Sequence, residues 1–129
     1  MNIRRMTDKQ KQAQDKLRKL TDASRILAAY EIELRYEEER AERADKTSAK
    51  EHRKRINEIK REMQAYKKDV EKAKKMISMC TDEIGKRILS MRYLQLMRME
   101  EIARILAYDR TYLYRVYYAA LENIQQQKP

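Results

Sequence analysis

Apolar side chains recur at every third or fourth position through two long stretches of the first 80 residues. In the first stretch they are Ala13, Leu17, Leu20, Ala23, Leu27, Tyr30 and Leu34. In the second they are Ile56, Ile59, Met63, Tyr66, Val70, Ala73 and Ile77. This alternation of three and four is the heptad pattern of a helix with one narrow apolar seam, so each stretch predicts a long helix.

The two predicted helices are separated by residues 37–49, EEERAERADKTSA, which have no apolar seam. Asp45, Thr47 and Ser48 in this segment favour a turn, because their side chains hydrogen-bond to nearby backbone groups. Two seams of similar length around a short polar break predict an antiparallel helical hairpin that folds over at residues 45–48. The alternative is one unbroken helix that pairs with a second copy in a parallel coiled coil.

A different spacing appears between Met99 and Ile124, where two short amphipathic patterns flank a break. The expected inward positions are Ile102, Ala103 and Leu106 in the first pattern and Leu113, Val116 and Ala120 in the second. Tyr108 would close the turn, and the Asp109 carboxylate can cap the second helix. Two short helices joined in this way form a helix-turn-helix, whose second helix enters a DNA major groove. A plain three-helix bundle that binds no nucleic acid is the alternative, because periodicity alone does not exclude it.

Ala107 occupies the turn position of this motif that often holds glycine. A left-handed backbone at an alanine would cost about 1–2 kcal/mol if the turn uses it. Many DNA-binding turns avoid that conformation with a slightly different bend, so Ala107 does not argue against the motif.

A further helix is expected from about Asp82 to Tyr93, with Thr81 and Asp82 as candidate N-caps. Residues 94–98 then link this helix to the motif. The predicted organisation is an all-α chain, with a long antiparallel coiled-coil hairpin at residues 1–80 and a three- to four-helix DNA-binding domain at residues 81–129.

The composition agrees with an all-α fold. The 129 residues include one Gly, one Pro, no Phe and no Trp, and 40% of them are charged, a balance that favours long helices with ion pairs. The formal net charge of +10 indicates a polyanionic partner, and double-stranded DNA fits the motif. We expect a cytoplasmic protein without membrane contact, because no apolar run could span a bilayer and the N-terminus lacks the apolar core of a signal peptide.

Most of the positive charge lies outside the predicted DNA-binding domain. Residues 81–129 hold eight Lys or Arg against six Asp or Glu, whereas residues 1–80 hold 23 against 15. The basic residues of the hairpin include the run His52–Arg55 and Lys60, Arg61, Lys67 and Lys68. They form either a surface that follows DNA phosphates or the solvated flank of a coiled coil. The mixed charge usual at outer helix positions favours the solvated flank.

The sequence gives no support for catalytic or metal chemistry. Cys80 is the only cysteine and His52 the only histidine, so neither an internal disulfide nor a metal site of paired His or Cys ligands can form. Gly85 is the only glycine, which excludes a glycine-rich phosphate loop. We expect a packed thiol at Cys80, a partly buried or capping role for His52, no metal, no cofactor and no enzymatic activity.

The outward positions of the second motif helix, residues 110–124, provide the candidate DNA contacts. They are Arg110, Thr111, Tyr112, Tyr114, Arg115 and Tyr118. An arginine can form two hydrogen bonds with a guanine edge or bind a phosphate, and a threonine can contact a thymine methyl group or a phosphate. The hydroxyl groups of Tyr112 and Tyr114 can reach phosphates. Tyr108 and Tyr117 are expected to pack between helices instead.

Residues Arg87–Ile124 resemble the C-terminal, promoter-reading domain of bacterial sigma factors. The shared features are Arg92 and Tyr93 at a helix end, the acidic opening Glu100–Ala103, and the Ala120–Leu121 step. Together with the preceding hairpin, this domain is similar to the ArpU-type and RinA-type late transcription regulators of phages and prophages. The resemblance implies a sigma-like helix-turn-helix, activation of late genes with RNA polymerase as a partner, and promoter binding through Arg110, Thr111, Tyr114 and Arg115.

This sequence departs from the sigma-like pattern in two ways. Leu96 or Met97 stands where a turn glycine is usual before the motif, and the recognition helix is rich in tyrosine. Both departures bear on which DNA sequence is read more than on DNA binding itself.

The sequence therefore predicts a sequence-specific transcription regulator that forms a homodimer through its coiled coil. Two other functions stay open. One is a DNA-packaging protein resembling a small terminase subunit, which also joins a helix-turn-helix to a helical oligomerisation element. The other is a helical protein-interaction module. A ring of many subunits would favour packaging, whereas activity that survives charge reversal at Arg110 and Arg115 would favour protein binding.

Overall fold

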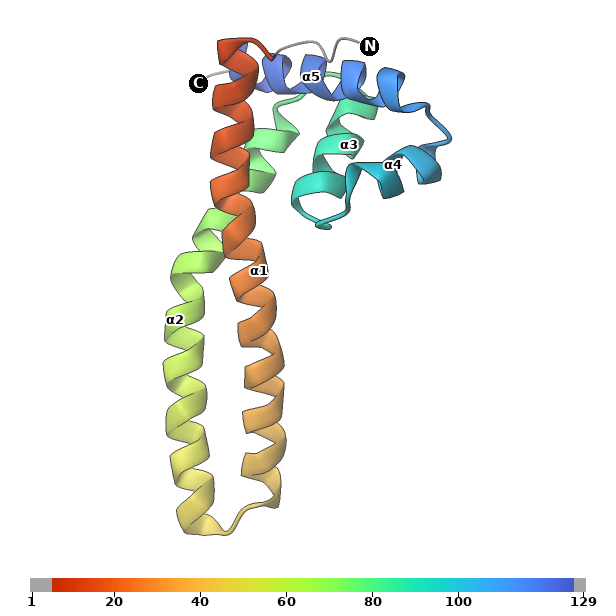
Figure 1. Ribbon diagram of the computed structural model, residues 1–129. Coiled ribbons are helices and arrows are strands. Elements are labelled where there is room, and N and C mark those ends of the chain that lie inside the picture. The colour runs from red at the N-terminus through yellow and green to blue at the C-terminus, as the bar shows by residue number, and fades with distance from the viewer. Residues whose placement is uncertain (1–5, 127–129) are drawn as a thin grey trace. The chain divides into compact units, whose positions relative to one another are not determined.

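The computed structural model describes residues 6–126, and this part of the chain folds into five α-helices. They are α1 (Asp8–Arg43), α2 (Lys46–Ser78), α3 (Glu83–Tyr93), α4 (Met99–Leu106) and α5 (Arg110–Gln126). Helices α1 and α2 form a long antiparallel hairpin, which three shorter helices follow (Figure 1). The predicted all-α class and antiparallel hairpin are confirmed, and the unbroken parallel alternative is wrong. None of these five helices is long and apolar enough to cross a membrane.

The described chain divides into two compact units. The hairpin unit comprises residues 22–70. The terminal unit comprises residues 6–21 and 71–126, so the first residues of α1 and the last residues of α2 belong with α3, α4 and α5. The separate domains expected at residues 1–80 and 81–129 stay a prediction.

The hairpin unit has a narrow core between α1 and α2. Ala23, Ile59 and Met63 are its buried apolar side chains. The rings of Tyr30 and Tyr66 pack against each other across the two helices, with their centroids 5.8 Å apart. A seam of this width explains why the sequence shows one apolar position in every three or four.

Ion pairs between α1 and α2 supplement this seam. Arg55 Nη2 donates to Glu33 Oε1 at 2.6 Å, and His52 Nδ1 lies 2.7 Å from Glu37 Oε2. The His52 ring is half-buried. The only histidine of the chain thus has the partly buried, structural role expected from the sequence.

The hairpin reverses at Ala44 and Asp45, and α2 begins at Lys46. The Asp45 side chain accepts the N–H of Ser48 at 2.9 Å, and hydrogen bonds from Ser48 lower the pKa of the Asp45 carboxyl group. The reversal therefore begins one residue before the predicted segment 45–48, and Thr47 and Ser48 lie in the first turn of α2. The hydrogen bonding between the Asp45 side chain and the backbone, which predicted a turn, caps the start of α2.

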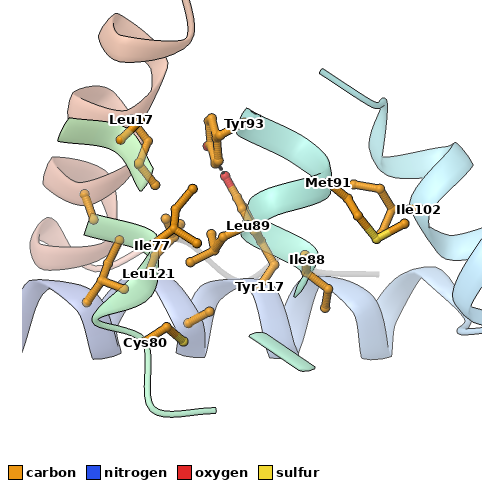
Figure 2. Packing of buried hydrophobic residues seen from close by; sticks show 14 of the residues in the cluster. Leu17, Ile77, Cys80, Ile88, Leu89, Met91, Tyr93, Ile102, Tyr117 and Leu121 are labelled. Carbon is orange, nitrogen blue, oxygen red and sulfur yellow. Dashed lines mark hydrogen bonds between the residues drawn. The ribbon is translucent and has the colours of Figure 1, made fainter. Parts of the chain in front are cut away.

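The terminal unit contains the larger apolar core (Figure 2). Leu17 of α1 and Ile77 of α2 pack there with Ile88 and Leu89 of α3 and with Leu121 of α5. All five side chains are at most 2% exposed. The hairpin helices therefore supply part of the core on which the three shorter helices fold.

A buried polar link joins three helices of the terminal unit. The hydroxyl groups of Tyr93 and Tyr117 lie 2.5 Å apart, and Gln14 Nε2 donates to the Tyr117 hydroxyl at 2.9 Å. Burial raises the pKa of the Tyr93 hydroxyl above its usual range. This link connects α1, α3 and α5 and places the two buried tyrosines in fixed positions.

Helices α3 and α5 approach each other closely at Gly85. A Cβ atom added to Gly85 would lie 2.9 Å from Ala120 Cβ and 3.1 Å from Asp82 Oδ2. The same Asp82 carboxylate accepts the Gly85 N–H at 2.9 Å and caps α3, as predicted. Thr81, the other candidate cap, hydrogen-bonds to Asn123 instead. Glycine thus lets α3 lie directly on the helix that carries the candidate DNA contacts.

Candidate nucleic-acid interface

The turn between α4 and α5 closes with a Schellman arrangement at the end of α4. The N–H of Tyr108 donates to Ala103 O at 3.0 Å, and the N–H of Ala107 donates to Arg104 O at 3.3 Å. Ala107 has φ 57° and ψ 40°, so the turn does use the left-handed conformation considered from the sequence. Because alanine carries a Cβ atom, this residue stores about 1–2 kcal/mol of strain.

Asp109 caps the start of α5, as predicted. Its Oδ1 accepts the N–H of Tyr112 at 2.8 Å, and its carbonyl oxygen accepts the N–H of Leu113 at 3.0 Å. This cap determines where α5 begins. It therefore places Arg110 and Thr111 in the first turn of the helix, next to the bend.

A carboxylate also orders the start of α4. Glu101 Oε1 accepts the backbone N–H of Arg98 at 3.3 Å and the Nε of the same arginine at 3.2 Å. These bonds lower the pKa of Glu101. They also hold the Arg98 guanidinium beside the first turn of α4.

The predicted inward positions of the motif do face the core. Ile102, Leu113 and Ala120 are buried. Four others are partly buried against the same cluster: Ala103, Leu106, Tyr108 and Val116. Helix α3 packs against both α4 and α5, and α4 packs against α5. The two motif helices are therefore supported from one side, and the other side of α5 is free to carry polar residues.

The predicted contact residues of α5 fall on different sides of the helix. Arg110, Thr111, Tyr112 and Arg115 are exposed, whereas Tyr114 and Tyr118 are half-buried. Residues four apart share a face, so Thr111 and Arg115 lie together, about half a helical turn away from the buried Leu113. Arg110 and Tyr114 share a flank, where the Arg110 guanidinium carbon lies 5.6 Å from the ring centroid of Tyr114.

The tyrosines of α5 make several ring contacts. Tyr114 and Tyr118 lie with ring centroids 5.8 Å apart, and both contact the buried Tyr117. Burial raises the pKa of Tyr118. Tyr112 packs edge-on against Tyr108 with centroids 4.9 Å apart. Tyr117 is thus a core residue, as expected, and DNA contacts by the other α5 tyrosines stay predictions.

A cleft of about 410 Å³ opens beside the first turns of α4 and α5. Its lining residues are Arg92, Arg98, Met99, Glu100, Ala103, Arg110, Leu113 and Tyr114. Glu101 pairs with Arg98 just outside this lining, and the remaining arginines, Arg92 and Arg110, against Glu100 leave the cleft positive. The N-termini of α4 and α5 add partial positive charge at the same place. A phosphate group has the charge and the acceptor oxygens that this cleft can bind.

Sequence reasoning found Arg110 but missed Arg92 and Arg98 as parts of the same site. Arg92 lies in the last turn of α3, and its Nη1 donates to Met97 O at 3.0 Å, which directs the guanidinium along the link to α4. The available signal was one arginine near the end of the predicted helix before the linker, Arg92, and one at the end of the linker, Arg98. The sequence could not predict that both arginines lie close to Arg110, because this proximity depends on how α3 packs against the motif.

Neither the single cysteine nor the acidic side chains form a second candidate site in the described part of the chain. Cys80 is buried, and burial raises the pKa of its thiol, so it is the packed cysteine that the sequence indicated. Within residues 6–126, no three or more His, Cys, Asp or Glu side chains are arranged to hold a metal ion.

Comparison with known proteins found no matching family model, no matching curated protein and no matching solved structure.

Proposed function

We propose that this protein is a sequence-specific transcription regulator that binds double-stranded DNA with α5 in the major groove. One observation carries the proposal: Arg110, Thr111 and Arg115 are exposed in the first two turns of a helix that follows a capped helix-turn-helix bend. The recognition helix of such a motif contacts base edges with its N-terminal residues.

Thr111 and Arg115 are the residues suited to reading bases. They share the face of α5 that points away from the buried Leu113. An arginine on such a face can bind guanine O6 and N7 together, which discriminates against the wrong base by about 1–3 kcal/mol. Thr111 can contact a thymine methyl group from the neighbouring turn of the helix.

Arg110 is suited to a phosphate, because it lines the cleft together with Arg92 and Arg98. Contacts with phosphates set the position and orientation of a protein on the duplex but carry no sequence information. The proposed site therefore combines a base-reading face on α5 with an adjacent phosphate cleft that α3, α4 and α5 line together.

Regulation of transcription is the part of the proposal that relies on the resemblance of residues 87–124 to the promoter-reading domain of sigma factors. Activation of phage or prophage late genes, with RNA polymerase as a partner, follows from the same resemblance. These roles are consistent with a compact motif that reads a short site.

A homodimer through the hairpin belongs to this proposal. Ile32 and Tyr36 lie four residues apart on α1, and their side chains are 69% and 53% exposed. Apolar side chains grouped on one helix face are suited to packing against a second copy. Two copies would double the short DNA segment that one recognition helix reads.

The test is selection from a pool of random duplex DNA at about 150 mM salt, where phosphate attraction alone is weakened. The proteins compared are the wild type, Arg110→Ala/Arg115→Ala, and the control Lys86→Ala/Arg87→Ala on α3. We expect the wild type and the control to enrich the same motif and the α5 variant to enrich none. A wild type that enriches no motif would overturn the proposal and favour the packaging or protein-interaction alternative.

A further inference from the structure

Six basic residues of α2 form a regular pattern within the hairpin unit. They occur as three adjacent pairs, Arg53 with Lys54, Lys60 with Arg61, and Lys67 with Lys68, at intervals of seven residues. All six side chains are exposed. We refer to them as the cationic stripe.

The repeat of seven places the three pairs on one side of the helix. Seven residues are close to two full turns, and successive pairs are about 10.5 Å apart along the axis. The first members of the pairs form one column along the helix, and the second members form another. Asn57 and Gln64 lie between these two columns and are exposed and uncharged. From residue 53 to residue 68 this side of α2 therefore carries positive charge and no carboxylate.

Within the hairpin unit, the carboxylates of α2 lie in the other outward columns of the heptad and are Glu51, Glu58, Glu62 and Asp69. Glu71, the first residue of α2 in the terminal unit, stands in the column of Asn57 and Gln64 and pairs with Lys74. Two of the hairpin-unit carboxylates gather around Arg55, which lies 3.3 Å from Glu58 and 4.0 Å from Glu62. Between residues 53 and 68 the stripe side of α2 therefore holds no carboxylate, whereas the acidic side also holds Arg55.

The two carboxylates of α1 that pair with α2 do so outside the stripe. Glu33 and Glu37 are bound to Arg55 and His52, which are not stripe residues. In the described part of the chain, none of the six stripe side chains forms a salt bridge. The solvated flank of a coiled coil normally mixes charges or pairs them between helices. The stripe does neither.

We infer that the cationic stripe binds the phosphate backbone of duplex DNA without reading its sequence. The spacing of the pairs is comparable to the Debye length, about 10 Å at 0.1 M salt, so their fields add along the helix. Duplex DNA carries a negative charge about every 1.7 Å along its axis and can neutralise such a row of cations. This inference rests on the proposed function only in taking DNA as the polyanion. It replaces the solvated flank favoured from sequence.

The experiment measures binding of the full chain to a random-sequence duplex over a series of salt concentrations. The stripe variant is Lys54→Gln/Lys60→Gln/Arg61→Gln/Lys68→Gln. The matched control, Lys11→Gln/Lys16→Gln/Lys19→Gln/Arg25→Gln, removes the same charges from exposed positions of α1. Circular dichroism of each variant establishes that the helices are retained, because glutamine has nearly the helix propensity of lysine.

We expect the stripe variant to reduce the slope of log affinity against log salt by about 3–4, since each lost phosphate contact reduces it by about 0.9. The control should reduce the slope by about 1 or less on the same scale. Equal reductions in the two variants would overturn the inference. So would unchanged DNA binding together with loss of binding to polyglutamate, which would identify an acidic protein as the partner.

The outcomes separate this inference from the proposed function. If the wild type selects a DNA motif and the stripe variant keeps the wild-type slope, the inference fails and the proposed function stands. If the wild type selects no motif and the stripe variant still loses slope against its control, the reading role of α5 fails and the stripe stands.

Discussion

Single residues decide the geometry of the proposed reading motif. Ala107 has a left-handed backbone where glycine would be free of strain, and Gly85 allows an approach that no side chain would permit. The role of each residue can be tested by replacing the alanine with glycine and the glycine with alanine.

Replacing Ala107 with glycine should stabilise the protein by about 1 kcal/mol, because it removes the strain of a Cβ atom at positive φ. Ala107 is exposed, so no packing is lost. Ala119→Gly, at an exposed position inside α5, is the matched control and should destabilise by about 1 kcal/mol. Urea unfolding monitored by circular dichroism measures both, and destabilisation by Ala107→Gly would contradict the described turn.

Replacing Gly85 with alanine should destabilise the protein by about 1–3 kcal/mol, although alanine favours helices. The added Cβ would lie 2.9 Å from Ala120 Cβ, a contact between two short side chains that cannot turn aside. Thermal unfolding of Gly85→Ala, Ala120→Gly and the double variant measures the contact. The double variant should lose less stability than the sum of the losses in the two single variants, because removing the Ala120 Cβ relieves the contact. Losses that simply add would show that the two Cβ atoms are not in contact.

At the scale of elements, two helices of this chain start with the same local design. Asp45 caps α2 before Lys46 and Thr47, and Asp109 caps α5 before Arg110 and Thr111. Only the second of these helices carries the proposed reading face.

Asp109→Ala and Asp45→Ala should each cost about 1 kcal/mol of stability, because each leaves a first-turn N–H without its carboxylate acceptor. Only Asp109→Ala should also weaken binding to the DNA motif that selection identifies, since fraying of α5 would displace Arg110 and Thr111. Chemical unfolding and fluorescence polarisation measure the two effects. An equal loss of DNA affinity in the two variants would argue against α5 as the reading element.

The sequence was most informative about elements. The heptad seams predicted the α1–α2 hairpin, and Asp82 and Asp109 were correctly assigned as caps, because these features depend on spacing and on local hydrogen bonds. The cleft beside the first turns of α4 and α5 was not predictable, because Arg92, Arg98 and Arg110 meet only once α3 packs against the motif. Leu17 could be assigned to an apolar seam, yet the seam does not say that this residue packs with α3 and α5.

For the whole molecule, the proposed homodimer makes a prediction about mass. Ile32→Glu/Tyr36→Glu should shift sedimentation equilibrium towards the monomer, because it places charge on the exposed apolar face of α1. The control Arg35→Glu/Glu39→Gln changes exposed positions beside this face without removing apolar surface. A dimer that persists in the Ile32 and Tyr36 variant would place the dimer contact elsewhere, and a wild type that is monomeric would contradict the homodimer.

The central claim, that α5 lies against DNA bases, is tested most directly by photo-cross-linking. The photoreactive amino acid p-benzoylphenylalanine replaces Tyr112 on α5 or, as the control, Ile26 on α1, two side chains that are 44% and 39% exposed. Each protein is irradiated with the duplex obtained by selection. Cross-links from position 112 to bases of the selected motif, and none from position 26, are the predicted result. A duplex that is bound yet forms no cross-link with position 112 would contradict the placement of α5 in the groove.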